Sequence, residues 1–250
     1  MESICYKKNF ITEAISKIEF LNPITDLDKS LPKTLSDDLK GLFPIAESRT
    51  ITNNIVDIVG DEVKKRREES TEWNFWNKER KRKITISKNV LMLVQYNYTT
   101  FKDFSDEFLT ALNSICSIYN ELIIKRYGVR YINNIRLKEE NPLDWSDYIN
   151  SELIASINIP KDRERISRTF HNLEMNYQEF NLRFNFGIHN PDYPALIKQK
   201  AFVLDMDAYH TGVQNKSDIE DSMPKFHNKI QEFFEFSITE NFREKHLNNA

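Results

Sequence analysis

Glycine and cysteine are scarce in this sequence of 250 residues, and no familiar catalytic motif occurs in it. The five glycines form neither a Walker-type loop nor a GxGxxG pattern, which argues against a nucleotide-dependent enzyme. Two cysteines are too few for a disulfide framework. The five histidines form no HxH or HxxxH pattern, and no GxSxG elbow supports a Ser/His/Asp triad. We therefore expect no catalytic residue, no cofactor and no metal site.

Long apolar runs and a strong net charge are absent as well. No window approaches the ~18 apolar residues of a membrane span, and the opening MESICYKKNF lacks the apolar core of a signal peptide. We therefore expect a cytoplasmic protein that binds no membrane. With 38 acidic and 35 basic residues, no overall field attracts nucleic acid, so such binding would need a local basic patch.

Apolar residues recur with the period of strands and with that of amphipathic helices. The clearest helical pattern covers residues 104–122, with Lys125 and Arg126 expected at its C-terminal end. Pro224 suggests that the last helix begins near Ser222 and continues to residue 238, with His227 in a packing role beside its apolar stripe. Shorter helices are expected at 30–42 and 143–157, and the charge run 64–70 is expected to be a solvated turn or loop. Strands are predicted at residues 10–21, 51–59, 73–75, 84–87, 90–98, 127–137, 167–175, 177–188 and 201–210.

Two stretches of the chain share one order of predicted elements. In each, a hairpin leads into an apolar strand (90–98 or 201–210), a short turn and a helix of about 20 residues. This order predicts an α+β fold in which helices cover one face of an antiparallel sheet or sheets. It also predicts an internal duplication of the hairpin-strand-helix unit. The halves would be residues 1–140 and 141–250, either as two lobes or as one continuous domain.

Strand alternation places a set of polar side chains on the face opposite the helices. An open face of mixed charge suits a partner protein or a second copy of the chain, and a hydrated surface of cross-strand ion pairs is the alternative. Asp205 and Asp207 are two residues apart, so both project from one face and could hold a divalent metal if a third ligand converged. The predicted binding residues of this face are Arg130, Asn134, Asn181, Arg183, Asp205 and Asp207.

A cluster of cations interleaved with tryptophans offers a second hypothesis. Cations can meet phosphates and rings can stack on bases, so the cluster suits RNA or DNA. The alternative is a solvated hairpin tip that the tryptophans anchor to the core, since nearby glutamates cancel part of the charge. The residues concerned are Trp73, Trp76, Lys78, Arg80, Lys81, Arg82 and Lys83.

Several segments, in chain order, resemble one family. They are residues 9–14 (NFITEA), 73–75 (WNF), 98–104, 127–133 (YGVRYIN), 204–207 (LDMD) and 227–239. Together they resemble a sporadically distributed prokaryotic family whose members carry an xPPIxEA opening and a central GxRYxN motif. Phe10 stands where that family usually has proline. The family has no established activity, so the resemblance implies no functional residue. Its patchy distribution is similar to that of accessory and defence genes.

The absence of a catalytic signature beside a well-patterned scaffold leads to one main prediction. We expect a non-catalytic binding or regulatory protein that acts through its polar sheet face on a partner protein, within a prokaryotic defence or toxin–antitoxin system. A nucleic-acid-binding module is the second hypothesis. A metal-dependent nuclease centred on Asp205 and Asp207 is the third.

Overall fold

Nine strands form one antiparallel sheet in the computed structural model, which describes residues 6–59 and 62–248, with side chains described outside 53–66. The strand order is β2-β3-β4-β5-β1-β6-β9-β8-β7. Its strands are β1 Ile11–Phe20, β2 Ile45–Val59, β3 Glu62–Trp76, β4 Arg82–Ser87, β5 Val90–Gln95, β6 Ile124–Leu137, β7 Thr169–Asn176, β8 Asn181–Ile188 and β9 Lys200–Gln214.

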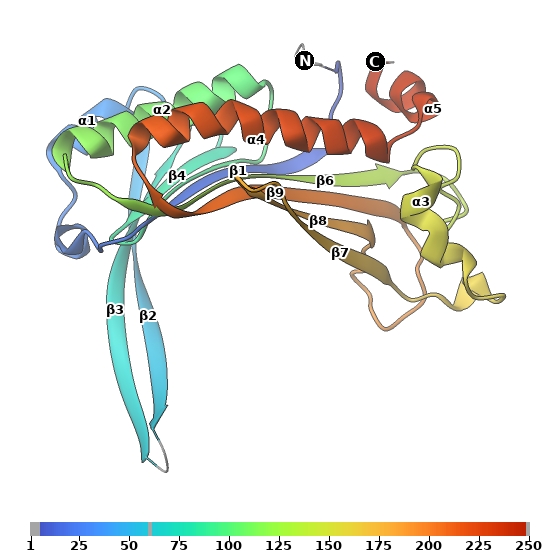
Figure 1. The fold of residues 1–250 in the computed structure, drawn as a ribbon, viewed down its shortest axis with the longest axis horizontal. Coiled ribbons are helices and arrows are strands. Elements are labelled where there is room, and N and C mark those ends of the chain that lie inside the picture. The colour runs from blue at the N-terminus through green and yellow to red at the C-terminus, as the bar shows by residue number, and fades with distance from the viewer. Residues whose placement is uncertain (1–5, 60–61, 249–250) are drawn as a thin grey trace.

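Three helices cover one face of this sheet, as Figure 1 shows: α1 (Lys33–Leu39), α2 (Phe101–Ile118) and α4 (Lys216–Ser237). The side chains of Phe104 and Phe108 on α2 are fully buried against the sheet, and burial of such a ring contributes about 1.5–3 kcal/mol. The short helices α3 (Ser151–Ile154) and α5 (Glu240–Phe242) lie at one end of the fold. None of the described helices is long and apolar enough to cross a membrane.

The predicted α+β class, with helices on one face of an antiparallel sheet, is confirmed. Strands from residues 1–140 and from 141–250 belong to the same sheet, because β6 pairs with β9. On its other side β6 pairs with β1, at the centre of the sheet. Outward from the β1–β6 pair the order is β5-β4-β3-β2 on one side and β9-β8-β7 on the other, with α2 following β5 and α4 following β9. A common origin of these two units stays a prediction.

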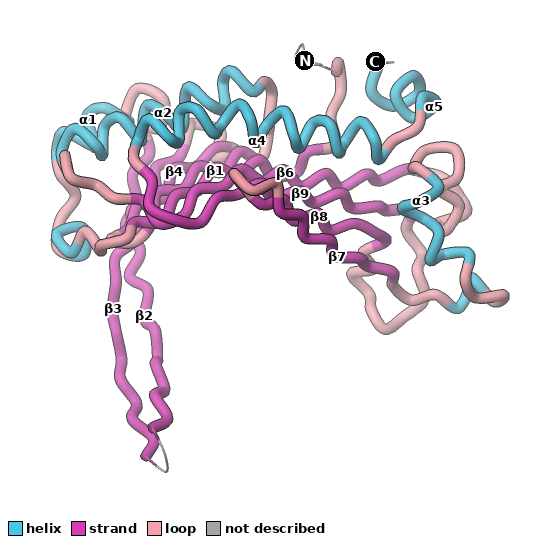
Figure 2. The backbone as a smooth tube through the Cα atoms, in the orientation of Figure 1, coloured by secondary structure: helices cyan, strands magenta, loops and turns pink. Residues whose placement is uncertain are grey.

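A two-stranded arm projects from the sheet on the side away from the helices (Figures 1 and 2). β3 pairs with β2 along its whole length, but only Glu72 to Trp76 pair with β4. The charge run 64–70, predicted to be a turn or loop, therefore lies in a strand. Such a run lacks the alternation of apolar and polar residues by which strands are predicted. A two-stranded ribbon with water on both faces nevertheless tolerates charge at every position. At the base of the arm, Thr71 donates from its amide and its hydroxyl to Asp28, each at 3.0 Å.

Two helix predictions were wrong. Residues 143–157 form turns, the single turn α3 and a short 3₁₀ segment, Ala155–Asn158, rather than one helix. The last helix begins at Lys216 instead of near Ser222, with Pro224 inside it. Asn215 and Asp218 form a reciprocal capping box that fixes this earlier start, and the helix keeps its course although Pro224 lacks an N–H donor.

Candidate functional site

A cross-strand ion pair lies at the centre of the uncovered sheet face. Arg130 on β6 donates two hydrogen bonds to Asp205 on β9, from Nε to Oδ1 at 2.6 Å and from Nη2 to Oδ2 at 2.7 Å. The Asn185 amide on β8 donates a third, at 3.1 Å. The Asp205 side chain is only 8% exposed, so these three donors replace the water that its carboxylate loses. Arg130 and Asp205 thus form a cross-strand ion pair, which is the expected alternative to a binding role.

A second set of groups continues the network along β9. Arg126 donates to Asp207 at 3.1 Å, and its guanidinium lies 4.7 Å from the centre of the Tyr209 ring. Burial raises the pKa of Asp207, and the three nearby arginines partly offset that rise. Gly128 makes this approach feasible, because a Cβ there would lie 3.1 Å from Tyr209 Cβ and 3.2 Å from Asp207 Oδ1.

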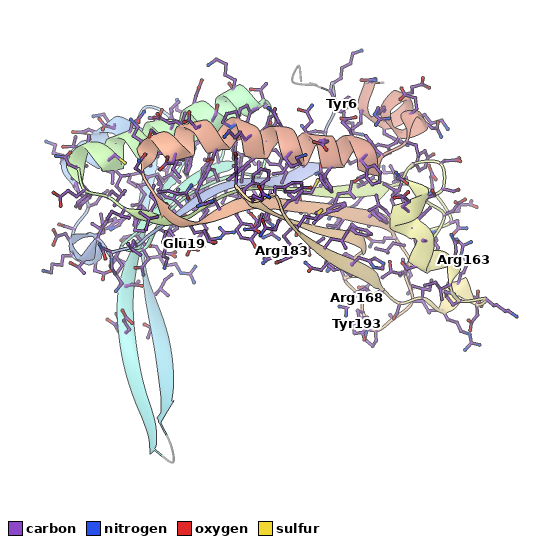
Figure 3. All side chains as sticks on the ribbon, viewed as in Figure 1. Tyr6, Glu19, Arg163, Arg168, Arg183 and Tyr193 are labelled. Carbon is purple, nitrogen blue, oxygen red and sulfur yellow. The ribbon has the colours of Figure 1, made fainter. Side chains whose placement is uncertain are left out.

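Arg183 on β8 extends the network toward the sheet edge. It lies on the side of the sheet away from α4 (Figure 3). Its Nε donates to Glu174 at 2.6 Å. Its guanidinium lies 5.8 Å from the centre of the Tyr209 ring. Three arginines and three carboxylates therefore neutralise one another across this face: Arg126, Arg130, Arg183, Glu174, Asp205 and Asp207.

The structure brings together four of the six predicted face residues, namely Arg130, Arg183, Asp205 and Asp207. Asn134 and Asn181 are not part of the network. The Asn134 Oδ1 accepts a hydrogen bond from Arg136 Nε at 3.4 Å. Three members that the sequence did not single out are Arg126, Asn185 and Glu174. Arg126 was expected at a helix end, but α2 ends at Ile118 and Arg126 lies in β6, in phase with Arg130.

Asp205 and Asp207 pair with the guanidinium groups of Arg130 and Arg126, respectively, rather than with further acidic groups. Within residues 6–59 and 62–248, no three His, Cys, Asp or Glu side chains converge as a metal site would require.

The predicted nucleic-acid cluster splits into anchored and exposed side chains. Trp73 Nε1 donates to the carbonyl of Leu27 at 2.8 Å, which ties this ring to the 3₁₀ turn Thr25–Asp28. The Trp76 ring lies on the uncovered face, where Arg80 approaches it at 5.7 Å and Lys83 at 5.2 Å. Arg80 also pairs with Glu47, with Nη1 to Oε2 at 3.3 Å. These contacts fit the anchored hairpin tip better than a free cationic patch.

Arg82 points to the opposite face and enters the protein interior. Its Nη1 donates to Glu107 Oε1 at 2.5 Å, and Gln95 donates to the other carboxylate oxygen at 2.7 Å. Glu107 is a buried residue of α2, so Arg82 compensates a charge that has left water. Lys78 and Lys81 are exposed, and their side chains form no ion pair with any described residue.

On the helix side, a cavity of about 310 Å³ lies between the start of α2, α4, β6 and the N-terminal segment. His227 on α4 lines it, with Nδ1 3.0 Å from the Tyr131 hydroxyl and its ring stacked on Phe101 at 4.0 Å. Burial lowers the pKa of His227 to about 4, so the ring is neutral at pH 7. The expected packing role of His227 agrees with this burial.

No family model matches the chain, and no curated protein matches it. The family resemblance that rests on the central GVRYIN segment and its flanking motifs therefore stays a prediction.

Proposed function

We propose that this chain is a non-catalytic binding protein that engages a partner protein through the uncovered face of its sheet. One observation carries the proposal. All three helices packed on the sheet lie on one face, while the β2–β3 arm projects from the other side (Figure 1). A wide antiparallel sheet is thereby left open next to a ribbon that reaches beyond it.

The side chains of this face favour a protein over a nucleic acid. Arginine, tyrosine and tryptophan are the residues most enriched at protein–protein hot spots, and Arg183, Tyr209 and Trp76 lie here. The paired charges leave no cationic excess in the network, whereas binding to phosphates depends on unpaired cations. A partner protein can displace water from such a face without meeting a large field of one sign.

The arm supports the same proposal. Residues 62–71 of β3 lie beyond its pairing with β4, which corresponds to a ribbon of about 33 Å at the usual rise per residue. Two strands without a third are at best marginally stable in water. A partner that lies along the open face could also contact this ribbon and stabilise it.

Nucleic-acid binding finds less support. Of the five predicted cations, Arg80 and Arg82 are engaged by carboxylates and Lys83 lies over the Trp76 ring, which leaves Lys78 and Lys81 to face a phosphate. That the partner belongs to a defence or toxin–antitoxin system stays a prediction from the resemblance.

The test uses affinity-tagged chain expressed in its native host. Arg183→Glu reverses a charge on the open face, and Lys225→Glu reverses an exposed charge on α4 as the matched control. Both wild type and Lys225→Glu should retain the same partner chain in a stoichiometric amount, and Arg183→Glu should lose it. Sedimentation of the eluate shows whether that partner is a second copy. Retention of the partner by Arg183→Glu, or an absorbance ratio showing only nucleic acid, would contradict the proposal.

A further inference from the structure

The cavity on the helix side of the sheet has no part in the proposed partner binding. Its walls come from segments far apart in the chain: Tyr98 and Phe101 near the start of α2, Tyr131 on β6, and Ile230 and Phe234 on α4. Ring-bearing side chains come from each of these segments. At about 310 Å³ the cavity is at the small end of the range for sites that bind metabolite-sized molecules.

Asn133 supplies a buried polar group to this cavity. The residue is 3% exposed and lines the cavity. Its Nδ2 makes one long hydrogen bond to the Leu204 carbonyl at 3.4 Å, and its Oδ1 accepts none from the part of the chain that the structure describes. The two amide atoms can be exchanged by a flip, but either orientation leaves one of them without a partner. An amide group without a hydrogen-bond partner is destabilising away from water, so a ligand that pairs with it gains affinity.

The ionisable groups around the cavity offer no free charge to a ligand. Glu235 accepts hydrogen bonds from Tyr6 at 2.7 Å and from Arg243 at 2.8 Å, so its carboxylate is already compensated. Lys102 is exposed at the rim and pairs with Asp106. An ion entering the cavity would lose its hydration without gaining a counter-charge, which disfavours both anions and cations.

We infer that this cavity binds an uncharged molecule of metabolite size, with a flat apolar body and an N–H donor that reaches Asn133 Oδ1. The rings of Tyr98, Phe101 and Phe234 would contact the flat body. The Asn133 carboxamide would fix its orientation, since it can both accept from an N–H group and donate to a carbonyl.

The test titrates the full chain with three probes of one shape: benzamide, which is neutral and has N–H donors, acetophenone, which has none, and the benzoate anion. Ligand-observed NMR measures their affinities. Benzamide should bind saturably, and benzoate should bind at least about tenfold more weakly because its charge is not compensated. No saturable binding of benzamide, or equal affinity of benzoate, would overturn the inference. These outcomes do not depend on the open sheet face, so they are independent of the partner-binding test.

Two neighbouring asparagines give a matched pair of variants. Asn133 faces the cavity and Asn134 faces the opposite side of β6. Asn133→Ala should weaken benzamide binding about tenfold while leaving acetophenone binding unchanged, and Asn134→Ala should change neither. An equal loss in both variants would overturn the assignment. The probe series on the wild-type chain stays decisive if Asn133→Ala does not fold.

Discussion

The stability of this protein should depend on pH through one buried imidazole. His227 is 7% exposed, and the groups that face it are the uncharged Tyr131 hydroxyl and the Phe101 ring. Because burial removes water without supplying a carboxylate, the pKa of His227 falls from 6.5 to about 4 on folding. Lowering the pH should therefore destabilise the folded state through this residue.

The sign follows from proton counting. Between pH 6.5 and pH 4 the unfolded chain binds a proton at His227 that the folded chain does not, so acid favours the unfolded state. From pH 7 to pH 5 this difference lowers the free energy of unfolding by about 2 kcal/mol. The loss should be largely complete only as the pH approaches the folded pKa.

Urea unfolding at pH 7, 6 and 5 measures this loss in wild type and in His227→Gln. The glutamine keeps a polar group near Tyr131 but does not titrate. The wild-type free energy of unfolding should fall by about 2 kcal/mol more than that of the variant over this range. Other titrating groups, His246 included, are present in both proteins and cancel. Equal pH slopes would refute the reasoning that His227 is buried and neutral.

Two further substitutions test other parts of the fold. Arg82→Ala leaves the buried Glu107 carboxylate without its guanidinium, so it should lower the free energy of unfolding by about 3 kcal/mol. The control Lys81→Ala should change that free energy by less than about 0.5 kcal/mol. Similar small effects of both substitutions in urea unfolding would show that the ion pair is not buried. Gly187→Ala should cost at least about 2 kcal/mol, because φ is +139° and the new Cβ would lie 2.3 Å from a backbone carbonyl oxygen of β7. Gly41→Ala, with open space around its Cα, is the matched control, and equal melting temperatures for the two variants would contradict the strain.

The sequence predicts the regular parts of the fold well, because burial on one face leaves a clear period. Residues of β1 alternate between buried and partly exposed as expected, from Ala14 to Phe20. The end of α2 could not be read in the same way. Tyr119 and Leu122 continue the apolar spacing after the helix has ended at Ile118, because they still pack against the core from the following turn. Because of this continued spacing, Arg126 was predicted at the end of a helix, whereas it lies in β6.

The candidate sites were predictable to different degrees. Alternation alone placed Arg130, Asp205 and Asp207 on one face, since successive side chains of a strand point to opposite sides. The pairing of Arg130 with Asp205 depends on the register between β6 and β9, which a single sequence does not contain. The cavity around Asn133 depends on how α2, α4 and the N-terminal segment pack above the sheet. Its one sequence signal is a polar residue in phase with the buried Tyr131.

Binding through the uncovered sheet face is tested most directly by hydroxyl-radical footprinting of the chain with and without its co-purified partner. Tyr96, stacked beside Trp76 on that face, is 40% exposed, and Phe236 on α4 is 49% exposed. Their similar exposure in the free chain makes them a matched pair. The partner should slow the oxidation of Tyr96 severalfold and leave Phe236 unchanged. Protection of Phe236 with no change at Tyr96 would place the partner on the helices and contradict the proposed function.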